Sequence, residues 1–434
     1  MVSQIEKLVN KPFIKNVVIV MTGTASAQII SMLASPIITR LYGPEAFGIM
    51  GTFIAIMGLF TPVAALTYSN AIVLPKSDAD AKALIRLSIG ISVIYAFVLT
   101  VLLLVFNDRI VSLFKMEEMG AFIYLLPIVI IFAGLTQIAE QWLIRTKQFK
   151  ITAKVTFLQV LINQGSKIGI GFFVPIAAVL IFLTAINDGM KAFMMIGFAK
   201  KSAYEPNYGE NESYTSVLSV AKEHLDFPLF RAPQSLINAV SQSLPILLLS
   251  SFFGPVAAGF FALGRTVLFF PSHIIGKSVG DVFYPRIADA AKNEESLSFL
   301  IKKATIALAL IGTIPFGTVI ILGPWLFSLV FGADWGMAGE YARWIAFWSF
   351  TNFINRPSVV ALPVLSAQAF HLGYTVFMLA VWSTSMATGY YVFLNDVTAV
   401  AFWGVTGSLL NLGLILITAR ISKKYDAKKS MKNE

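Results

Sequence analysis

The chain has 434 residues, of which 57% are hydrophobic and only 13% charged, and its mean hydropathy is +0.76. Soluble domains carry about 25% charged residues, so this composition excludes a soluble globular domain and indicates an integral membrane protein. The net charge of +10 comes from basic residues in short loops between apolar runs, a pattern of membrane topology rather than of nucleic-acid binding. The absence of cysteine excludes a disulfide framework, a thiol nucleophile and a cysteine-zinc cluster.

Apolar runs long enough to cross a bilayer recur along the whole chain, since a spanning helix needs about 20 apolar residues. The first run continues past Ala25-Ser26-Ala27, which resembles a cleavage site, to Thr39, so we interpret it as an uncleaved first helix. Only Val174-Pro175 separates the fifth run from the sixth. In chain order, the sequence predicts twelve spans, at 16–39, 47–74, 84–106, 121–144, 154–173, 176–199, 226–253, 257–283, 303–331, 337–365, 369–393 and 398–421.

Basic residues concentrate in alternate loops of this predicted topology. If the amino end is cytoplasmic, the outside loops hold only Arg40, Arg109 and Lys115, and the other loop lysines and arginines fall inside. Because cytoplasmic loops are enriched in Lys and Arg, we expect both termini in the cytoplasm and an even number of spans.

The two halves of the chain share landmarks. The motif Gly43-Pro44-x-x-x-Gly48 recurs as Gly254-Pro255-x-x-x-Gly259, and prolines follow each copy at similar distances. Each Gly-Pro pair predicts the tight outer turn of a helical hairpin, because proline ends one helix and opens the next. Six helices in each half would give both halves one orientation, related by an axis along the membrane normal.

This pattern predicts a domain organisation in four parts. They are an N-terminal six-helix bundle at 1–201, a flexible cytoplasmic linker at 202–222, a C-terminal six-helix bundle at 223–421 and a basic cytoplasmic tail at 422–434. An amphipathic segment from Ile287 to Ile301 is expected to lie along the inner membrane surface.

Several cations lie inside the apolar runs, where a charge costs about 2.5 kcal/mol or more unless it faces protein or a water-filled cavity. Arginine suits phosphate because its planar fork donates two hydrogen bonds to oxyanion edges. We therefore predict a cationic cavity for a phosphate, a pyrophosphate or an acidic sugar. Its candidate cations are Arg231, Arg265, Lys277, Arg356, Lys167 and Lys191. Polar side chains at helical spacing extend the site: Gln234, Asn238 and Gln242 share a face with Arg231, and Asn163 shares one with Lys167.

Three acids are candidates for ion coupling: Asp188, Glu140 and Asp281. A carboxyl group in a low dielectric can be neutral near physiological pH and so carry a proton. The spacings of Asp188 with Lys191 and of Lys277 with Asp281 fit structural ion pairs equally well. The position of Glu140 near a span end also fits a side chain that reaches the interface. The chain has no Walker A, metal-binding or hydrolase motif, which indicates neither an enzyme nor a cofactor or metal site.

Four stretches carry a resemblance to a known family. They are IITRLYGPEAFGIMGTF at 37–53, SNAIVLPKSDADA at 69–81, QWLIRTKQF at 141–149 and FPLFRAPQSLINAVSQSLPILLLSSFFGPVAAGFFAL at 227–263. In these stretches the chain resembles polysaccharide flippases of the O-antigen and exopolysaccharide translocase type (Wzx-like). That group is the polysaccharide transporter branch of the multidrug/oligosaccharidyl-lipid/polysaccharide exporter superfamily.

The resemblance implies an all-α integral membrane fold, with twelve transmembrane helices in two six-helix bundles that form a V-shaped central cavity. It implies alternating access that moves undecaprenyl-pyrophosphate-linked oligosaccharide units across the bacterial cytoplasmic (inner) membrane, for O-antigen, lipopolysaccharide, capsule or exopolysaccharide synthesis. A proton or sodium gradient would drive it without ATP, and Arg231, Arg265 and Lys277 would hold the pyrophosphate. The expected partners are the lipid-linked glycan, membrane lipid, a polysaccharide polymerase and a chain-length regulator, with no nucleic acid and a monomeric chain.

An ion-coupled multidrug or metabolite antiporter of the related branch is the alternative. Those exporters handle organic cations and favour acidic binding residues, whereas the first span, 16–39, contains no acid. A membrane scaffold without transport activity is a third hypothesis, which predicts no dependence on any buried charge.

Overall fold

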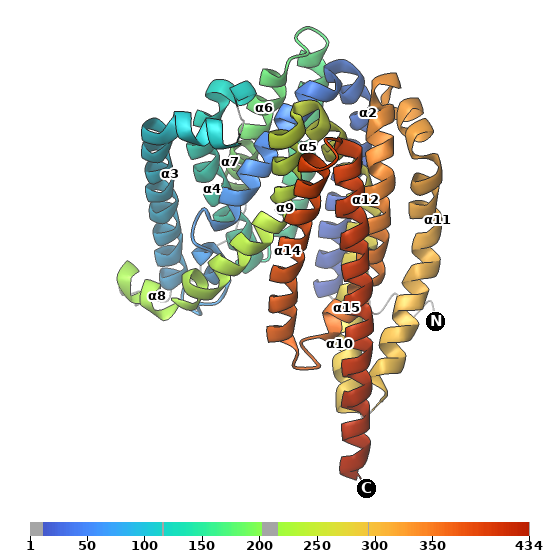
Figure 1. The fold of residues 1–434 in the computed structure, drawn as a ribbon. Helices are drawn as coiled ribbons and strands as arrows, with labels where there is room; N and C mark the ends of the chain where they lie inside the picture. The colour runs from blue at the N-terminus through green and yellow to red at the C-terminus, as the bar shows by residue number, and fades with distance from the viewer. Residues whose placement is uncertain (1–11, 115–116, 202–215, 294, 434) are drawn as a thin grey trace. The chain divides into compact units, whose positions relative to one another are not determined.

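The computed structural model describes residues 12–114, 117–201, 216–293 and 295–433. Within these ranges the side chains at 12–21, 107–108, 110, 112–114, 117–118, 270–282, 285, 292 and 428–433 are not described. The described residues form helices and turns without a strand, which confirms the all-α prediction (Figure 1). The chain divides into two compact units, Met1–Leu247 and Leu248–Glu434.

Among its described residues, the first unit contains eight α-helices, three short 3-10 helices and one π-helix. These are α2 (Pro12–Phe60), η1 (Thr61–Val63), η2 (Tyr68–Val73), α3 (Asp78–Phe114), η3 (Glu117–Leu125), α4 (Leu126–Arg145), α5 (Phe149–Gly171), α6 (Ala177–Ala185), α7 (Asn187–Lys200), α8 (Val217–Glu223), the π-helix η4 (Phe227–Arg231) and α9 (Ala232–Phe253). The division lies inside α9, so residues 223–247, assigned above to the C-terminal bundle, belong to the first compact unit.

The second unit is built from longer helices. They are α10 (Pro255–Lys292), α11 (Leu297–Phe331), η5 (Ala333–Trp335), α12 (Gly336–Ile354), α13 (Arg356–Ala361), α14 (Gln368–Tyr391) and α15 (Asp396–Asn433).

Seven helical segments among the described residues are long and apolar enough to cross a membrane. They are Thr22–Val63, Asp78–Phe106, Met119–Arg145, Ala177–Lys200, Phe227–Phe253, Leu297–Phe331 and Asp396–Ala427. The first covers two predicted spans, and the predicted spans on α5, α12 and α14 are helical without being apolar enough. The predicted span 257–283 lies on α10, where Pro255–Phe269 forms a shorter apolar helix and the side chains of 270–282 lie outside the described residues. In α5 the reason is visible, since Gln159, Asn163 and Lys167 interrupt the apolar run. The count of twelve spans therefore stays a prediction.

Both Gly-Pro motifs form the same backbone turn. Gly43 has φ 69° and ψ 172°, and Gly254 has φ 85° and ψ 179°. Glycine adopts positive φ readily because it has no Cβ, and Pro44 and Pro255 then begin the next helix with a φ that suits its first turn. The repeat recognised in the sequence is thus a repeat of local structure.

In the first unit, Arg145 at the end of α4 fastens the segment between η2 and α3. Its guanidinium donates from Nε and Nη2 to Asp78 Oδ1, at 3.1 and 2.8 Å. It also donates to three backbone carbonyls, those of Ile72 at 3.2 Å, Pro75 at 2.6 Å and Ser77 at 3.1 Å. All five N–H groups of the side chain are used, and both members of the ion pair are about nine-tenths buried.

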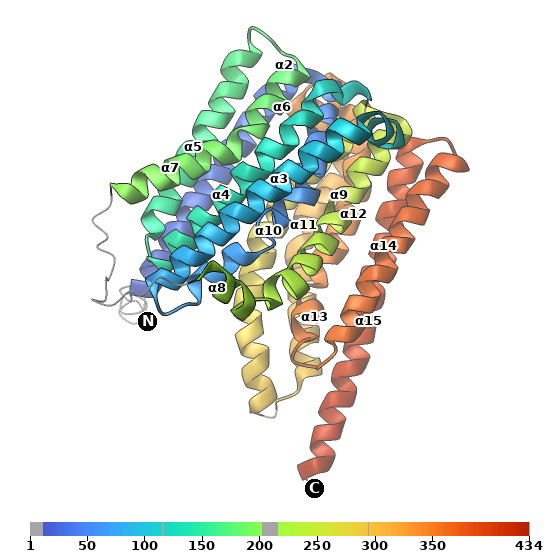
Figure 2. The same cartoon turned by 90° about the vertical axis from the view of Figure 1, so that its left-hand side faces the viewer.

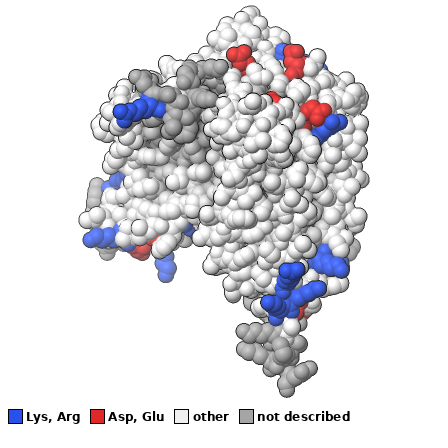
Figure 3. Space-filling view, viewed as in Figure 1, with Lys and Arg blue, Asp and Glu red and all other residues white. Residues whose placement is uncertain are grey.

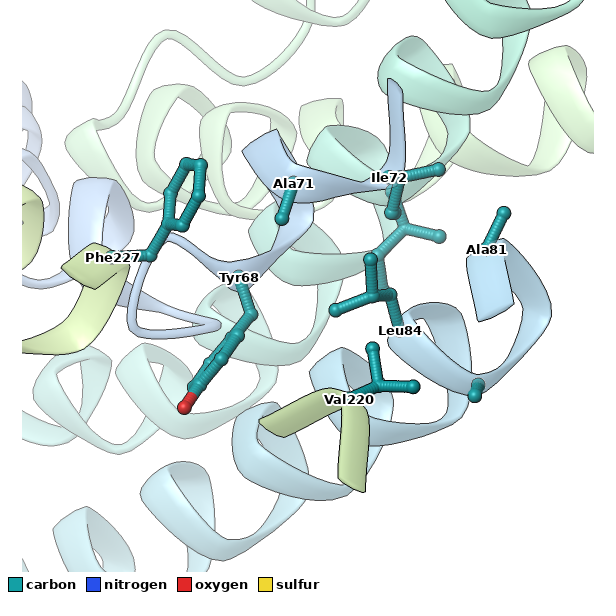
Figure 4. Close-up of a cluster of buried hydrophobic side chains, with 9 residues drawn as sticks. Tyr68, Ala71, Ile72, Ala81, Leu84, Val220 and Phe227 are labelled. Atoms are coloured by element: carbon teal, nitrogen blue, oxygen red, sulfur yellow. The ribbon is translucent and has the colours of Figure 1, made fainter. Parts of the chain in front are cut away.

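Part of the predicted linker is docked onto the first unit. Residues 202–215 lie outside the described residues, but Val217–Glu223 forms α8, and Val220 is buried beside Tyr68, Ile72 and Leu84 (Figure 4). The Tyr68 hydroxyl donates to the Ala221 carbonyl at 3.0 Å. The expectation of a flexible linker is therefore wrong for 217–222, because an apolar side chain and a hydrogen bond hold this segment in place.

Helices of the second unit pack through glycines at close range. The backbones of α11 and α12 meet at Gly323 and Gly339, where a Cβ on either residue would collide with the other helix. Gly389 of α14 lies in the same way against the backbone of Ala399 in α15. Small residues allow such close approach between membrane helices, which gain stability from van der Waals packing rather than from the hydrophobic effect.

The segment from Ile287 to Ile301 is not one amphipathic helix on the membrane surface, so that expectation is wrong. α10 ends at Lys292, and α11 begins at Leu297. Ile287, Leu297 and Ile301 are buried together against α13 and its following turn, through Ala361 and Leu365. The apolar side of the segment is covered by protein instead of lipid.

The predicted basic tail is, up to Asp426, part of a packed helix. α15 has 38 residues and so extends about 57 Å, well beyond a hydrocarbon core of about 30 Å. Figure 2 shows it running past the end of α14. Its Asp426 carboxylate accepts from the backbone N–H groups of Leu297 and Ser298, each at 3.0 Å, and from the Ser296 hydroxyl at 3.0 Å. The last helix therefore caps the N-terminus of α11.

Asp426→Ala is expected to lower the free energy of unfolding by about 1 to 2 kcal/mol, because it removes an acceptor and a negative charge from a helix N-terminus. Equilibrium unfolding of the purified protein in mixed micelles measures this loss. Lys424→Ala, at an exposed position on the same helix, is the matched control and should change little. Equal stability of the two variants would contradict the capping role.

Candidate functional site

Charged side chains on the face shown in Figure 3 gather near helix ends and leave the middles of the helices uncharged. A membrane protein is expected to have this distribution, since charges are costly at bilayer depth. Several predicted site residues are charged although they lie within apolar helices. The structure places most of them on the elements described above.

Arg231 occupies the last position of the π-helix η4, immediately before α9. Its side chain is exposed, and its guanidinium carbon lies 5.2 Å from the centre of the Phe227 ring. Phe227 itself is buried in the cluster of Figure 4, so the ring is a fixed support for the cation. A guanidinium over an aromatic face keeps its N–H edges free for an oxyanion.

The polar stripe of α9 continues from this cation. Gln234, Asn238 and Gln242 are all exposed, at the helical spacing that places them on one face. The structure therefore brings together the four residues that the sequence analysis grouped here. They form an exposed polar face on a helix that is apolar enough to span a membrane.

A second charged group lies between α4 and α7. Lys191 Nζ is 2.5 Å from Glu140 Oε1, and the Asp188 carboxylate lies within electrostatic range of both. The Thr136 hydroxyl of α4 donates to the Asp188 carbonyl at 2.7 Å and fixes the start of α7. The sequence spacing suggests Asp188 as the ion-pair partner of Lys191. In the structure Lys191 of α7 instead forms its salt bridge with Glu140 of α4. This cluster holds two of the three predicted coupling acids.

The predicted residues of α5 are used in helix packing. Asn163 is buried, and its amide donates to the Leu183 carbonyl of α6 at 3.0 Å. Gln159, one turn before it, is hydrogen-bonded to Asn187 of α7. Lys167 is partly buried, with its Nζ 3.9 Å from Met50 Sδ, and its carbonyl accepts from the Tyr42 hydroxyl at 2.7 Å. Asn163 and Lys167 thus lie where helices meet, and a ligand role for them stays a prediction.

The remaining candidates belong to the second unit. Arg265 is partly buried in α10, and Arg356 is exposed at the start of α13. Lys277 and Asp281 lie on the backbone of α10, but their side chains are outside the described residues. No cluster of three or more potential metal ligands occurs among the residues that the structure describes.

Two residues near the site make tertiary hydrogen bonds that no sequence motif indicates. The Thr67 hydroxyl donates to the Phe227 carbonyl at 3.0 Å, across a separation of 160 residues. Arg145 was counted with the cytoplasmic loop charges, although its guanidinium is enclosed by a turn. Neither contact follows from helical spacing, so only the fold could reveal them.

Solved membrane transporters share this fold at low sequence identity. An inward-facing multidrug resistance MATE family transporter of the MOP superfamily matches with a TM-score of 0.71 and 14% identity, covering 91% of this chain and 95% of that one. The lipid II flippase MurJ in an inward closed conformation matches with a TM-score of 0.69 and 12% identity, covering 93% and 87%. A MOP superfamily transporter from Pyrococcus furiosus matches with a TM-score of 0.59 and 13% identity, covering 93% and 94%. The protein is thus a multi-pass membrane protein with the fold of the MOP superfamily.

The polysaccharide biosynthesis protein family matches residues 37–339, and the chain belongs to that family. No curated protein matches the chain in sequence. The resemblance stated from the sequence is confirmed at the level of family and fold: the chain belongs to a polysaccharide biosynthesis family and has the fold of MOP superfamily transporters.

Proposed function

We propose that this protein moves undecaprenyl-pyrophosphate-linked oligosaccharide units across the bacterial cytoplasmic membrane, for the synthesis of O-antigen, capsule or another exopolysaccharide. The observation that carries the proposal is the exposed guanidinium of Arg231, held on a buried ring at the start of a membrane-spanning helix. Family membership supports a role in polysaccharide biosynthesis, and the fold supports transport.

In this proposal, Arg231 binds the pyrophosphate and the polar face of α9 binds the first sugars. Gln234, Asn238 and Gln242 offer amide donors and acceptors, which suit the hydroxyl groups of a glycan. Arg265, Arg356 and Lys277 are further candidate cations from the second half. The protein would work by alternating access in two six-helix bundles, as a monomer without catalysis, with both termini in the cytoplasm.

The charged group of Glu140, Lys191 and Asp188 is the proposed coupling site of the first half, with Asp281 a candidate in the second. The ion pair between Glu140 and Lys191 leaves the Asp188 carboxylate as the third, unbalanced charge of that group. It could exchange a proton or bind a sodium ion as the protein changes conformation. A polymerase and a chain-length regulator are the proposed protein partners.

Arg231→Ala is expected to abolish surface polysaccharide in a strain that depends on this protein, because the variant loses the guanidinium that binds pyrophosphate. Arg231→Lys keeps the charge without the planar fork and should restore only part of the activity. Arg265→Ala is expected to give the same loss as Arg231→Ala. The measurement is surface polysaccharide per cell, normalised to the amount of inserted protein.

Arg420→Ala, at an exposed position near the end of α15, is the matched control and should behave as wild type. Full activity of the Arg231→Ala, Arg265→Ala double variant would overturn the assignment of these cations. Resistance to cationic dyes conferred by the wild-type protein would instead support the multidrug antiporter.

A further inference from the structure

The turn between η1 and η2 has a backbone that its residues rarely adopt. Leu66 and Thr67 both have positive φ, 47° and 61°, and neither is glycine. A β-branched residue such as threonine is a clear outlier in the left-handed region, because its side chain crowds the backbone. Such strain persists where the surrounding structure enforces it, and it concentrates at functional sites.

The strained turn places one hydroxyl against one carbonyl. Thr67 Oγ1 donates to the Phe227 oxygen at 3.0 Å, and both residues are at least 95% buried. The same oxygen accepts the N–H of Ala232, five residues further on, which is the hydrogen bond of a π-helix. Thr67 therefore stabilises the π-helix η4 through the carbonyl of Phe227, its first residue. Single π-turns of this kind are frequent at functional sites.

The π-turn sets the direction of Arg231. An extra residue in the turn rotates every later side chain relative to an uninterrupted α-helix, so the turn decides where the guanidinium and the Phe227 ring meet. Leu229 and Phe230 are exposed beside Arg231, with 61% and 72% of their surface accessible. A cation flanked by exposed apolar side chains suits a phosphate that is joined to a hydrocarbon chain. The neighbouring acid, Asp226, acts electrostatically on Tyr68.

We propose that Thr67 is a positioning residue for Arg231: through the Phe227 carbonyl it holds the π-turn that presents the guanidinium to the phosphate of a lipid-linked ligand. This inference rests on the proposed function, because it takes Arg231 as the phosphate-binding cation. It adds to that function a residue that does not itself contact the ligand.

The test uses the full-length protein in detergent and inorganic pyrophosphate as the probe. Phenylglyoxal modifies accessible arginines, and peptide mass mapping reports the rate at Arg231 alone. Pyrophosphate should slow this rate in wild type by occupying the guanidinium. Thr67→Val keeps the shape of the side chain and removes the hydroxyl. We expect it to raise the pyrophosphate concentration that gives half-protection about tenfold, because the net contribution of one hydrogen bond corresponds to about that change in affinity.

Thr67→Ser retains the hydroxyl and should stay within about twofold of wild type. Thr67→Gly removes the hydroxyl and also relieves the strained backbone, so it serves if the valine variant does not fold, with the same tenfold rise expected. Tyr68→Phe is the matched control: it removes the neighbouring hydrogen bond to Ala221 without touching the Phe227 carbonyl, and its protection should equal that of wild type.

Unchanged protection in both Thr67→Val and Thr67→Gly would overturn the positioning role. The transport assay keeps this failure distinct from that of the proposed function. If Arg231→Ala is inactive while Thr67→Val transports like wild type at every substrate level, only the role of Thr67 fails. If Arg231→Ala transports normally, the phosphate assignment itself fails.

Discussion

Gly339→Ala is expected to cause one of the largest losses of stability available from a single methyl group in this protein. A Cβ at Gly339 would lie 2.5 Å from the Gly323 carbonyl carbon and 2.5 Å from Pro324 Cα, both on the facing helix. These are backbone atoms, so no side chain can rotate away and α11 must move as a whole. Overpacking typically costs about 1 to 3 kcal/mol, and we expect the upper end here.

Gly317→Ala is the matched control, because it adds the same methyl group to α11 at a position with no heavy atom within 4 Å. It should stabilise the helix by about 1 kcal/mol, since alanine favours helix over glycine by that amount. Equilibrium unfolding in mixed micelles should therefore move in opposite directions for the two variants. A Gly339→Ala protein as stable as wild type would show that α11 and α12 do not pack backbone to backbone.

Arg145→Ala is expected to cost about 3 to 5 kcal/mol, because it leaves a buried carboxylate without its partner. Asp78 and the carbonyls of Ile72, Pro75 and Ser77 would all lose a donor at once. Water can reach few of these atoms, since both ionic side chains are about nine-tenths buried. The measurement is the free energy of unfolding, together with the yield of folded protein in the membrane.

Arg145→Lys should be nearly as unstable, since an ammonium group has three donors and cannot make the five hydrogen bonds that the guanidinium makes to these four acceptor atoms. Lys150→Ala removes an exposed cation at the start of α5 and should change stability by no more than about 0.5 kcal/mol. If Arg145→Ala unfolds like Lys150→Ala, the segment between η2 and α3 does not depend on the guanidinium.

Features that arise from local chemistry could be predicted from the sequence. Long apolar runs correspond to helices over much of the predicted ranges, although the predicted span 47–74 is wrong beyond Phe60, where α2 ends and the turns η1 and η2 follow. The two Gly-Pro motifs form matching turns at Gly43 and Gly254. Helical spacing groups Arg231 with Gln234, Asn238 and Gln242, and all four side chains are exposed in the structure. Each of these depends on residues within a few turns of one another.

Features that arise from contacts between distant segments could not be predicted. Lys191 has Asp188 one turn away, yet its ion pair is with Glu140 on another helix. The apolar side of the segment Ile287 to Ile301 indicates burial without saying whether lipid or protein covers it. Thr67 has no local signal at all, because its role depends on a carbonyl 160 residues further along the chain.

The cap that Asp426 provides has a consequence for how the protein is made. Ser296, at the start of α11, leaves the ribosome 130 residues before the aspartate that accepts its hydroxyl. Throughout that interval of synthesis the first turn of α11 lacks this partner, and the second unit cannot reach its final form. The fold of the second unit can thus be completed only after α15 has been synthesised, 130 residues behind the helix that it caps.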